Sequence, residues 1–306
     1  MGKIAFVFSG QGAQYSGMGK SLYDADGKVK ALYESAEQIR PGTMNQSFSG
    51  TAEELKQTVN TQPCMYLTEL AAATALNSRG IFAEGTAGFS LGEIAALAYS
   101  GAYSVSDGFK IVIQRAKFME EAAKQHDTAM CAVLRLDSET VKNTVKEYDS
   151  LYAVNFNCPG QTVVSGIKSS IEKYSAEVKA LGGRAVPLAV SAAFHSPFMA
   201  EAADNFAHEL AKYDITAPEL PVYANLTAKP YGGDVLSTLS QQMKSPVKWQ
   251  ETVENMISDR FTDFIEVGPG KTLCGLISKI SKDVRTYSVE NEETLLETVQ
   301  AVKENA

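Results

Sequence analysis

The sequence has few cysteines, and their spacing excludes several kinds of site. Four cysteines are scattered through 306 residues, and no two of them form a Cys-x-x-Cys pair. They are Cys64, Cys131, Cys158 and Cys274. Zinc and dithiol redox sites need closely spaced cysteines, and small secreted proteins need many of them. We therefore expect free thiols in a reducing compartment and no metal site.

Long apolar runs and an excess of basic residues are also missing. The apolar run near the N-terminus, Ile4–Phe8, has only five residues, too few for a signal peptide. No stretch approaches the length of a membrane span. Lys and Arg number 28 against 36 Asp and Glu, a net charge of −8, which suits neither nucleic acid nor an anionic membrane. We expect a cytoplasmic protein that meets any acidic partner through a local basic patch.

Strand and helix patterns alternate in the first part of the chain. Residues Ile4–Phe8 predict a buried strand that runs into a glycine-rich turn. An Ala- and Leu-rich segment predicts a helix over 63–78, with Pro63 in its first turn. A short strand over 86–89 precedes another helix, and residues 107–124 have the pattern of a long amphipathic helix. This alternation predicts a mainly parallel sheet covered on both faces.

The pattern changes between residues 127 and 192. There the expected order is β-α-β-β-α-β, which is typical of a ferredoxin-like fold. The expected ranges are 130–134, 138–148, 151–155, 162–165, 170–181 and 185–190. The α/β pattern then resumes. We therefore predict an α/β core made of residues 1–126 and 193–306, with a small inserted subdomain at 127–192.

A nucleophile motif follows the second expected strand. Gly88-Phe89-Ser90-Leu91-Gly92 fits Gly-x-Ser-x-Gly between a strand and a helix. In that context the glycines permit a sharp turn that exposes the Ser90 hydroxyl, and the next backbone N–H points at a developing oxyanion. The alternative is a plain turn between two glycines, with Ser90 as a helix N-cap.

Only three histidines are available as a general base. His126 lies in a polar stretch, and His208 falls off the apolar stripe of its helix. His195 ends an apolar segment and precedes Ser196-Pro197, an N-cap followed by a first-turn proline. The positive end of that helix would keep the imidazole neutral, as a base must be. The alternative is a buried histidine with no chemical role.

An arginine lies in an apolar helical stripe. Arg115 is in line with Ile111 and Phe118, and a buried guanidinium without an anion is costly. It either forms an internal salt bridge, extends its charged end to the surface, or binds a substrate carboxylate with both nitrogens. The spacing alone favours the first two.

A glycine-rich loop follows the first expected strand. Gly10-Gln11-Gly12-Ala13-Gln14 lacks the glycines that a dinucleotide or phosphate loop requires. The loop lies where sheet ligands bind and can donate a backbone N–H.

Six segments in this order resemble the malonyl-CoA:acyl-carrier-protein transacylase family, and the match covers nearly the whole chain. They are residues 10–14, 88–93, 114–115, 155–161, 193–196 and 245–249, read as GQGAQ, GFSLGE, QR, NFNCPGQ, AFHS and SPVKW. The resemblance implies an α/β-hydrolase-like core with a ferredoxin-like insertion. It also implies acyl transfer with Ser90 as acyl carrier, His195 as base and Arg115 as the ligand of the malonyl carboxylate.

The resemblance extends to backbone groups. It implies an oxyanion hole made by the N–H groups of Gln11 and Leu91, and a backbone carbonyl at Gln242 that orients the histidine. Asn157 is on the segment that lines the pantetheine channel in relatives.

One position departs from the family pattern. The family usually has histidine before the nucleophile, where this chain has Phe89. We expect the chemistry to be retained, because the lost group is not the base, with altered polarity beside Ser90. The segment 193–196 resembles the malonyl-selective form of its motif.

The predicted function is therefore transfer of malonyl from malonyl-CoA to the phosphopantetheine thiol of an acyl carrier protein, through a malonyl-serine. We expect a monomer with no metal and no resident cofactor, since CoA and the carrier's arm are substrates. Alternatives are a stand-alone acyltransferase of a polyketide synthase or malonate decarboxylase system, a serine esterase or thioesterase, and a catalytically silent carrier-binding module. A buried Arg115 argues against a hydrolase of neutral esters.

Overall fold

The computed structural model describes residues 2–190 and 192–305. Its strands are β1 (Lys3–Phe8), β2 (Gly85–Gly88), β3 (Thr128–Leu134), β4 (Leu151–Cys158), β5 (Gln161–Ile167), β6 (Arg184–Pro187), β7 (Val222–Tyr223), β8 (Phe261–Val267) and β9 (Arg285–Val289). The α-helices are α1 (Lys20–Ala25), α2 (Gly27–Ile39), α3 (Thr43–Ser49), α4 (Ala52–Lys56), α5 (Thr58–Ser78), α6 (Gly92–Tyr99), α7 (Val105–Ala123), α8 (Ser138–Thr144), α9 (Lys168–Ala180), α10 (Ala200–Leu210), α11 (Val235–Gln242), α12 (Trp249–Ser258), α13 (Thr272–Ile280) and α14 (Glu292–Glu304). Two 3₁₀ turns, η1 (Val145–Glu147) and η2 (Pro197–Met199), complete them.

The larger sheet is parallel throughout, with the strand order β7-β2-β1-β8-β9. Strand β1 is central, and both of its faces are buried. Ala5 and Val7 pack with residues of α12 and α13, whereas Phe6 and Phe8 pack with residues of α5, α6 and α7. A strand covered on both sides has no polar face. This explains the uninterrupted apolar run at the start of the chain.

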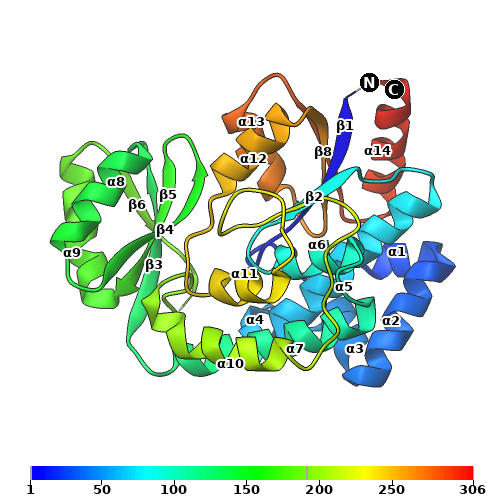
Figure 1. The fold of residues 1–306 in the computed structure, drawn as a ribbon, viewed down its shortest axis with the longest axis horizontal. Coiled ribbons are helices and arrows are strands. Elements are labelled where there is room, and N and C mark those ends of the chain that lie inside the picture. Colours follow the sequence, from blue (N-terminus) through cyan, green and yellow to red (C-terminus); the bar gives the residue numbers. More distant parts are fainter. Residues whose placement is uncertain (1, 191, 306) are drawn as a thin grey trace.

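The smaller sheet is antiparallel, with the order β4-β5-β3-β6, and α8 and α9 pack against it. Figure 1 shows it at the left, beside the larger sheet and its helices. The predicted fold class, a parallel sheet plus a small β-α-β-β-α-β unit, is confirmed. The small sheet lies inside the range 127–192, although those subdomain limits stay a prediction, and residues 1, 191 and 306 of the predicted ranges lie outside the described residues.

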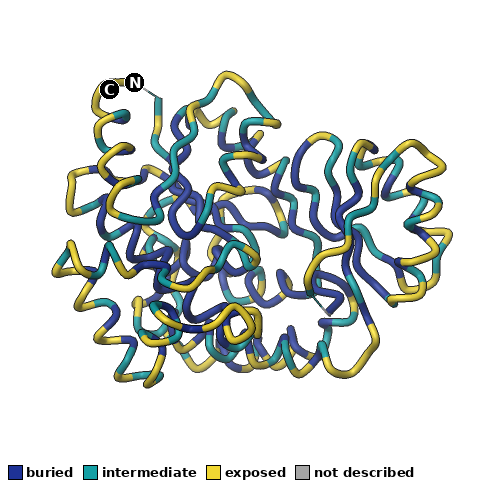
Figure 2. The backbone as a smooth tube through the Cα atoms, turned by 180° about the vertical axis from the view of Figure 1, so that it is seen from behind, coloured by how far each residue is buried: buried dark blue, intermediate teal, exposed yellow. Residues whose placement is uncertain are grey.

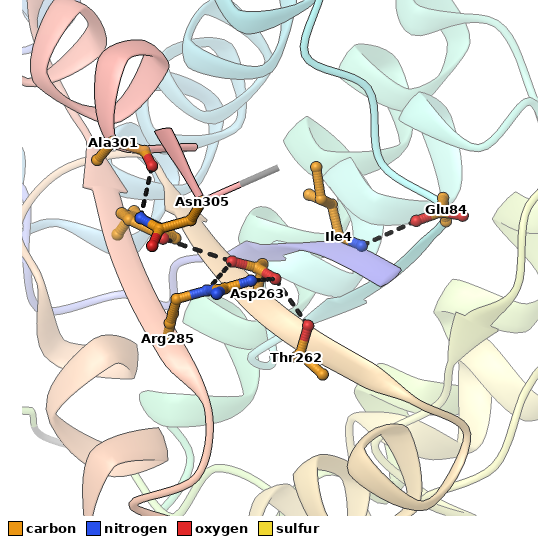
Figure 3. Close-up of polar contacts among 8 residues, drawn as sticks. Ile4, Glu84, Thr262, Asp263, Arg285, Ala301 and Asn305 are labelled. Carbon is orange, nitrogen blue, oxygen red and sulfur yellow. Dashed lines mark hydrogen bonds and ion pairs between the residues drawn. The ribbon is translucent and has the colours of Figure 1, made fainter. Parts of the chain in front are cut away.

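Both parts of the molecule have a buried interior. Figure 2 shows buried backbone along the inner strands and helices, with exposed segments at the outer loops and helices of both parts. At the edge of the larger sheet, Arg285 donates two hydrogen bonds to Asp263, at 2.6 and 2.7 Å (Figure 3). The two residues are directly paired between β8 and β9. This bidentate pair supports the register of the edge strand.

The predicted start of the long Ala- and Leu-rich helix is wrong. Helix α5 begins at Thr58, so Pro63 lies inside the helix and not in its first turn. Residues 60–73 of this helix are all buried. Packing around the whole circumference outweighs the hydrogen bond that a proline cannot donate. Within the described residues, no helix is long and apolar enough to cross a membrane.

Candidate active site

The nucleophile motif forms a strained turn between β2 and α6. Ser90 has a φ of 52°, a left-handed conformation that a serine rarely adopts. A Cβ on Gly88 would lie 2.0 Å from the carbonyl carbon of Gly92, and a Cβ on Gly92 would lie 2.3 Å from the carbonyl oxygen of Phe8. Glycine is therefore required at both positions. The turn places Ser90 at the carboxyl ends of β1 and β2, where ligands of parallel sheets bind.

A side chain that sequence reasoning missed holds this turn. Asn225, two residues after β7, accepts a hydrogen bond from the Ser90 N–H at 2.7 Å and donates one to the Gly88 carbonyl at 2.6 Å. Asn225 is buried. The sequence shows only a polar residue shortly after a short apolar segment, which was not enough to predict this contact.

His195 is in hydrogen-bonding contact with Ser90. Its Nε2 lies 2.7 Å from the Ser90 Oγ, and its Nδ1 lies 3.0 Å from the carbonyl oxygen of Gln242. The carbonyl can only accept, so Nδ1 carries the proton and Nε2 is left to accept from the serine. The histidine backbone, with a φ of 60°, is held by a hydrogen bond from its N–H to the Met243 carbonyl. The geometry suits a general base oriented by a backbone carbonyl.

The pKa of His195 is lowered from 6.5 to about 4. Burial of the ring is the largest cause, and the positive charge of Arg115 is the second. The sequence pattern predicted a neutral ring for a different reason, the positive end of the following helix. That segment begins with the three-residue 3₁₀ turn η2, so burial and Arg115 dominate instead. His126 and His208 are both exposed, and neither lines the cavity that contains Ser90.

Arg115 is fully buried and reaches the nucleophile from α7. Its Nη2 donates to the Ser90 Oγ at 3.2 Å and to the side-chain oxygen of Gln242 at 2.9 Å, and its Nη1 donates to Gln62 Oε1 at 2.9 Å. No ion pair to Arg115 exists among the described residues, and its Nε has no partner there. An internal salt bridge, one of the sequence alternatives, is therefore absent from that part of the chain. Burial likewise rules out a charged end at the surface.

The side chain of Gln242 is a second feature that the sequence did not indicate. Besides its carbonyl contact with His195, its Nε2 donates to the Ser90 carbonyl at 2.7 Å and to Glu93 Oε2 at 2.8 Å. One residue thus contacts the nucleophile, the base and the arginine.

The predicted oxyanion donors flank the nucleophile. Gln11, in the loop after β1, and Leu91, the N-cap of α6, line one cavity with Ser90. Across the described residues, neither backbone N–H has a hydrogen-bond acceptor. Both donors are therefore available to an oxyanion, and this role stays a prediction.

Two neighbouring cavities share part of their lining, and one of them contains the nucleophile. A cavity of about 100 Å³ is lined by Ser90, His195 and Arg115, and one of about 250 Å³ contains Asn157. Residues shared by both linings are Gln11, Phe89, Asn155 and Leu188. Among the described residues, the buried Oδ1 atoms of Asn155 and Asn157 have no hydrogen-bond partner. Asn157 thus lines the cavity next to the site, and its contact with pantetheine stays a prediction.

Phe89 forms part of the wall between these cavities, and its ring meets Trp249 edge to face with centroids 5.6 Å apart. An apolar ring therefore stands where the family pattern has an imidazole. Residues 2–190 and 192–305 contain no group of three or more His, Cys, Asp or Glu side chains that could hold a metal ion.

Comparison with known proteins agrees with this geometry. The acyl transferase domain family matches residues 5–298. The malonyl CoA-acyl carrier protein transacylase of Bacillus subtilis is 38% identical over 312 residues, covering 99% of this chain and 98% of that protein. The Escherichia coli K12 protein of the same name is 36% identical over 304 residues, covering 97% and 98%.

Solved structures give the same result. The transacylase of that name from Clostridium perfringens superimposes with a TM-score of 0.96 at 36% identity, covering 99% of this chain and 98% of the other. A malonyl-transacylase in complex with its type II PKS acyl-carrier protein has a TM-score of 0.94 at 32% identity, covering 98% and 99%. The chain therefore belongs to the malonyl-CoA:acyl-carrier-protein transacylase family of acyl transferases.

Proposed function

We propose that this enzyme transfers malonyl from malonyl-CoA to the phosphopantetheine thiol of an acyl carrier protein, through a malonyl ester of Ser90. The observation that carries the proposal is the convergence of His195 Nε2 and Arg115 Nη2 on the Ser90 Oγ, at 2.7 and 3.2 Å. An imidazole and a guanidinium meet at one hydroxyl, which supports a base and a carboxylate ligand acting at one nucleophile. The Clostridium perfringens transacylase has this fold over 98% of its chain, and the Bacillus subtilis transacylase aligns over 98% of its length.

In the first half-reaction, His195 takes the proton of Ser90 as its oxygen attacks the thioester carbonyl. The backbone N–H groups of Gln11 and Leu91 stabilise the tetrahedral oxyanion. The carbon–sulfur bond then breaks, and the CoA thiolate takes the proton from His195. Malonyl remains on Ser90, with its carboxylate on the guanidinium of Arg115.

In the second half-reaction, the carrier's thiol enters and the steps run in reverse. His195 takes the thiol proton, the thiolate attacks the serine ester, and Ser90 leaves with the proton returned from His195. The 250 Å³ cavity, which shares lining residues with the cavity at Ser90, offers a path for the arm. Its buried Asn155 and Asn157 oxygens can accept from the amide N–H groups of pantetheine.

The proposal also covers the cofactor requirement, the oligomeric state and the location of the protein. No resident cofactor is needed, because side chains and backbone groups supply every proton transfer and charge contact. A monomer is sufficient, since all of these groups come from one chain. The four cysteines are free, which suits a reducing, cytoplasmic location.

The test is to mix enzyme, malonyl-CoA and holo carrier, and to quantify malonyl-carrier and free malonate by mass spectrometry. We expect malonyl-carrier as the main product, and none with Ser90→Ala or with a carrier that lacks phosphopantetheine. Free malonate as the main product, in the presence of holo carrier, would identify a thioesterase instead.

A further inference from the structure

A buried carboxylate contacts Gln242, the residue that is hydrogen-bonded to both His195 and Arg115. Glu93 lies in the first turn of α6 and is fully buried, outside the cavity that contains Ser90. Its Oε1 accepts from the Tyr231 hydroxyl at 2.5 Å and from the Asn225 N–H at 3.2 Å, while its Oε2 accepts from Gln242 Nε2 at 2.8 Å. The reaction steps above give this side chain no role.

The contact with Gln242 determines how that amide is oriented. A primary amide has one accepting end and one donating end, whereas an ionised carboxylate can only accept. Glu93 therefore holds the NH₂ group of Gln242 on its own side, where it also reaches the Ser90 carbonyl at 2.7 Å. The oxygen of Gln242 is left facing Arg115 Nη2, at 2.9 Å. With the amide reversed, two donors would oppose each other at the arginine.

The negative charge of Glu93 also affects the buried guanidinium of Arg115. Arg115 is buried without an ion pair in the described part of the chain. Burial lowers the pKa of Arg115 to about 10, and the attraction of Glu93 is the largest influence that opposes this lowering. A buried cation needs a compensating charge, and here the charges are linked through the Gln242 amide. Glu93 thus acts on the guanidinium in two ways, by balancing its charge and by orienting its hydrogen-bond acceptor.

We propose that Glu93 is a positioning residue for malonyl selectivity, which keeps the Gln242 amide oxygen on Arg115 and so aims the guanidinium at the substrate carboxylate. This inference rests on the proposed malonyl transfer.

A pH dependence follows from the geometry. Burial raises the pKa of Glu93 from 4.5 to about 7, against the lowering effect of Tyr231, Gln242, Asn225 and Arg115. Tyr103 also lies close enough to interact with its charge. Below this pH the protonated carboxyl becomes a donor and no longer requires the observed amide orientation. His195 stays neutral down to about 4, so the base is not the group that titrates near neutrality.

The test compares kcat/KM for malonyl-CoA and acetyl-CoA between pH 5.5 and 8.5, in wild type, Glu93→Gln and Tyr231→Phe. Glu93→Gln presents an NH₂ group to Gln242 and removes the charge. We expect the malonyl-to-acetyl ratio at pH 8 to fall about tenfold or more, the size of one charge-assisted hydrogen bond. The wild-type ratio should fall below about pH 7, and this fall should be absent in Glu93→Gln.

Tyr231→Phe is the matched variant, because it keeps the carboxylate and removes a hydrogen bond that lowers its pKa. Its ratio should match wild type at pH 8.5, with the acid fall moved to higher pH. Equal losses for both acyl groups in Glu93→Gln, or an unmoved pH profile in Tyr231→Phe, would overturn the inference. If wild type transfers no malonyl, the proposed function fails first, and that outcome is visible in the same assay.

Discussion

The Nη2 of Arg115 donates a hydrogen bond of 3.2 Å to the Oγ of Ser90, so the buried cation and the nucleophile are direct neighbours. The same oxygen lies 2.7 Å from Nε2 of His195. A positive charge at this distance favours an ionised serine and opposes a protonated histidine. Arg115 therefore acts on the base, in addition to the contact with the substrate carboxylate that we propose for it.

Removing this charge should change the titration of His195. In Arg115→Met the pKa of His195 should rise above the wild-type value of about 4, because a repelling cation is lost. In Arg115→Lys it should stay low, since the charge is retained. NMR titration of the imidazole measures all three values. An unchanged pKa in Arg115→Met would mean that burial alone keeps the ring neutral.

The general base is tested by comparing the three histidines. His195→Ala should slow malonyl transfer by at least the ~10²-fold expected for loss of a general base. His126→Ala and His208→Ala should have rates close to wild type, because both side chains are exposed and outside the cavity that contains Ser90. Steady-state transfer rates at one pH are sufficient. A crippled His208→Ala variant would contradict the assignment.

Arg115 should also determine which acyl group is transferred. A bidentate carboxylate pair in a buried site is worth about 2–5 kcal/mol on truncation. Arg115→Ala should therefore shift the malonyl-to-acetyl ratio of kcat/KM by ~10²-fold or more. Arg115→Lys should recover only part of the ratio, because an ammonium cannot form the two-pronged contact. Equal losses for both acyl groups would give Arg115 a purely structural role.

Salt should weaken docking of the carrier protein. The enzyme has a net charge of −8, and acyl carrier proteins are typically acidic, so contact requires a local basic patch. Raising ionic strength should increase the KM for the carrier more than the KM for a small thiol acceptor. A carrier KM that does not change with salt would remove the electrostatic part of this account.

Local patterns predicted the elements of the site better than the contacts between them. The Gly-x-Ser-x-Gly turn and the choice of His195 among three histidines follow from short segments, and the family resemblance supplied the Gln242 carbonyl. Asn225 and Glu93 could not be predicted in this way. Asn225 lies 135 positions from Ser90, and its role depends on β7 pairing with β2. Glu93 is within the motif, but only the fold shows that Gln242 and Tyr231 surround it.

The start of helix α5 depends on tertiary packing, which the sequence pattern did not indicate. The rule that proline occupies a first helical turn placed the start of α5 at Pro63, five residues too late. Proline inside a helix removes a hydrogen bond, and in α5 the burial of residues 60–73 compensates for that loss. For His195 the direction of the pKa change was predicted, and its main cause, burial in the assembled site, was not.

The central claim is that Ser90 carries malonyl as an ester, and direct detection of that ester tests it. Wild-type enzyme mixed with malonyl-CoA should gain the mass of one malonyl group, and peptide mapping should place it on Ser90. Ser90→Ala should gain none, and addition of holo carrier should remove the group from wild type as malonyl-carrier appears. An adduct on any of the four cysteines or on another serine, or transfer by Ser90→Ala at the wild-type rate, would contradict the account.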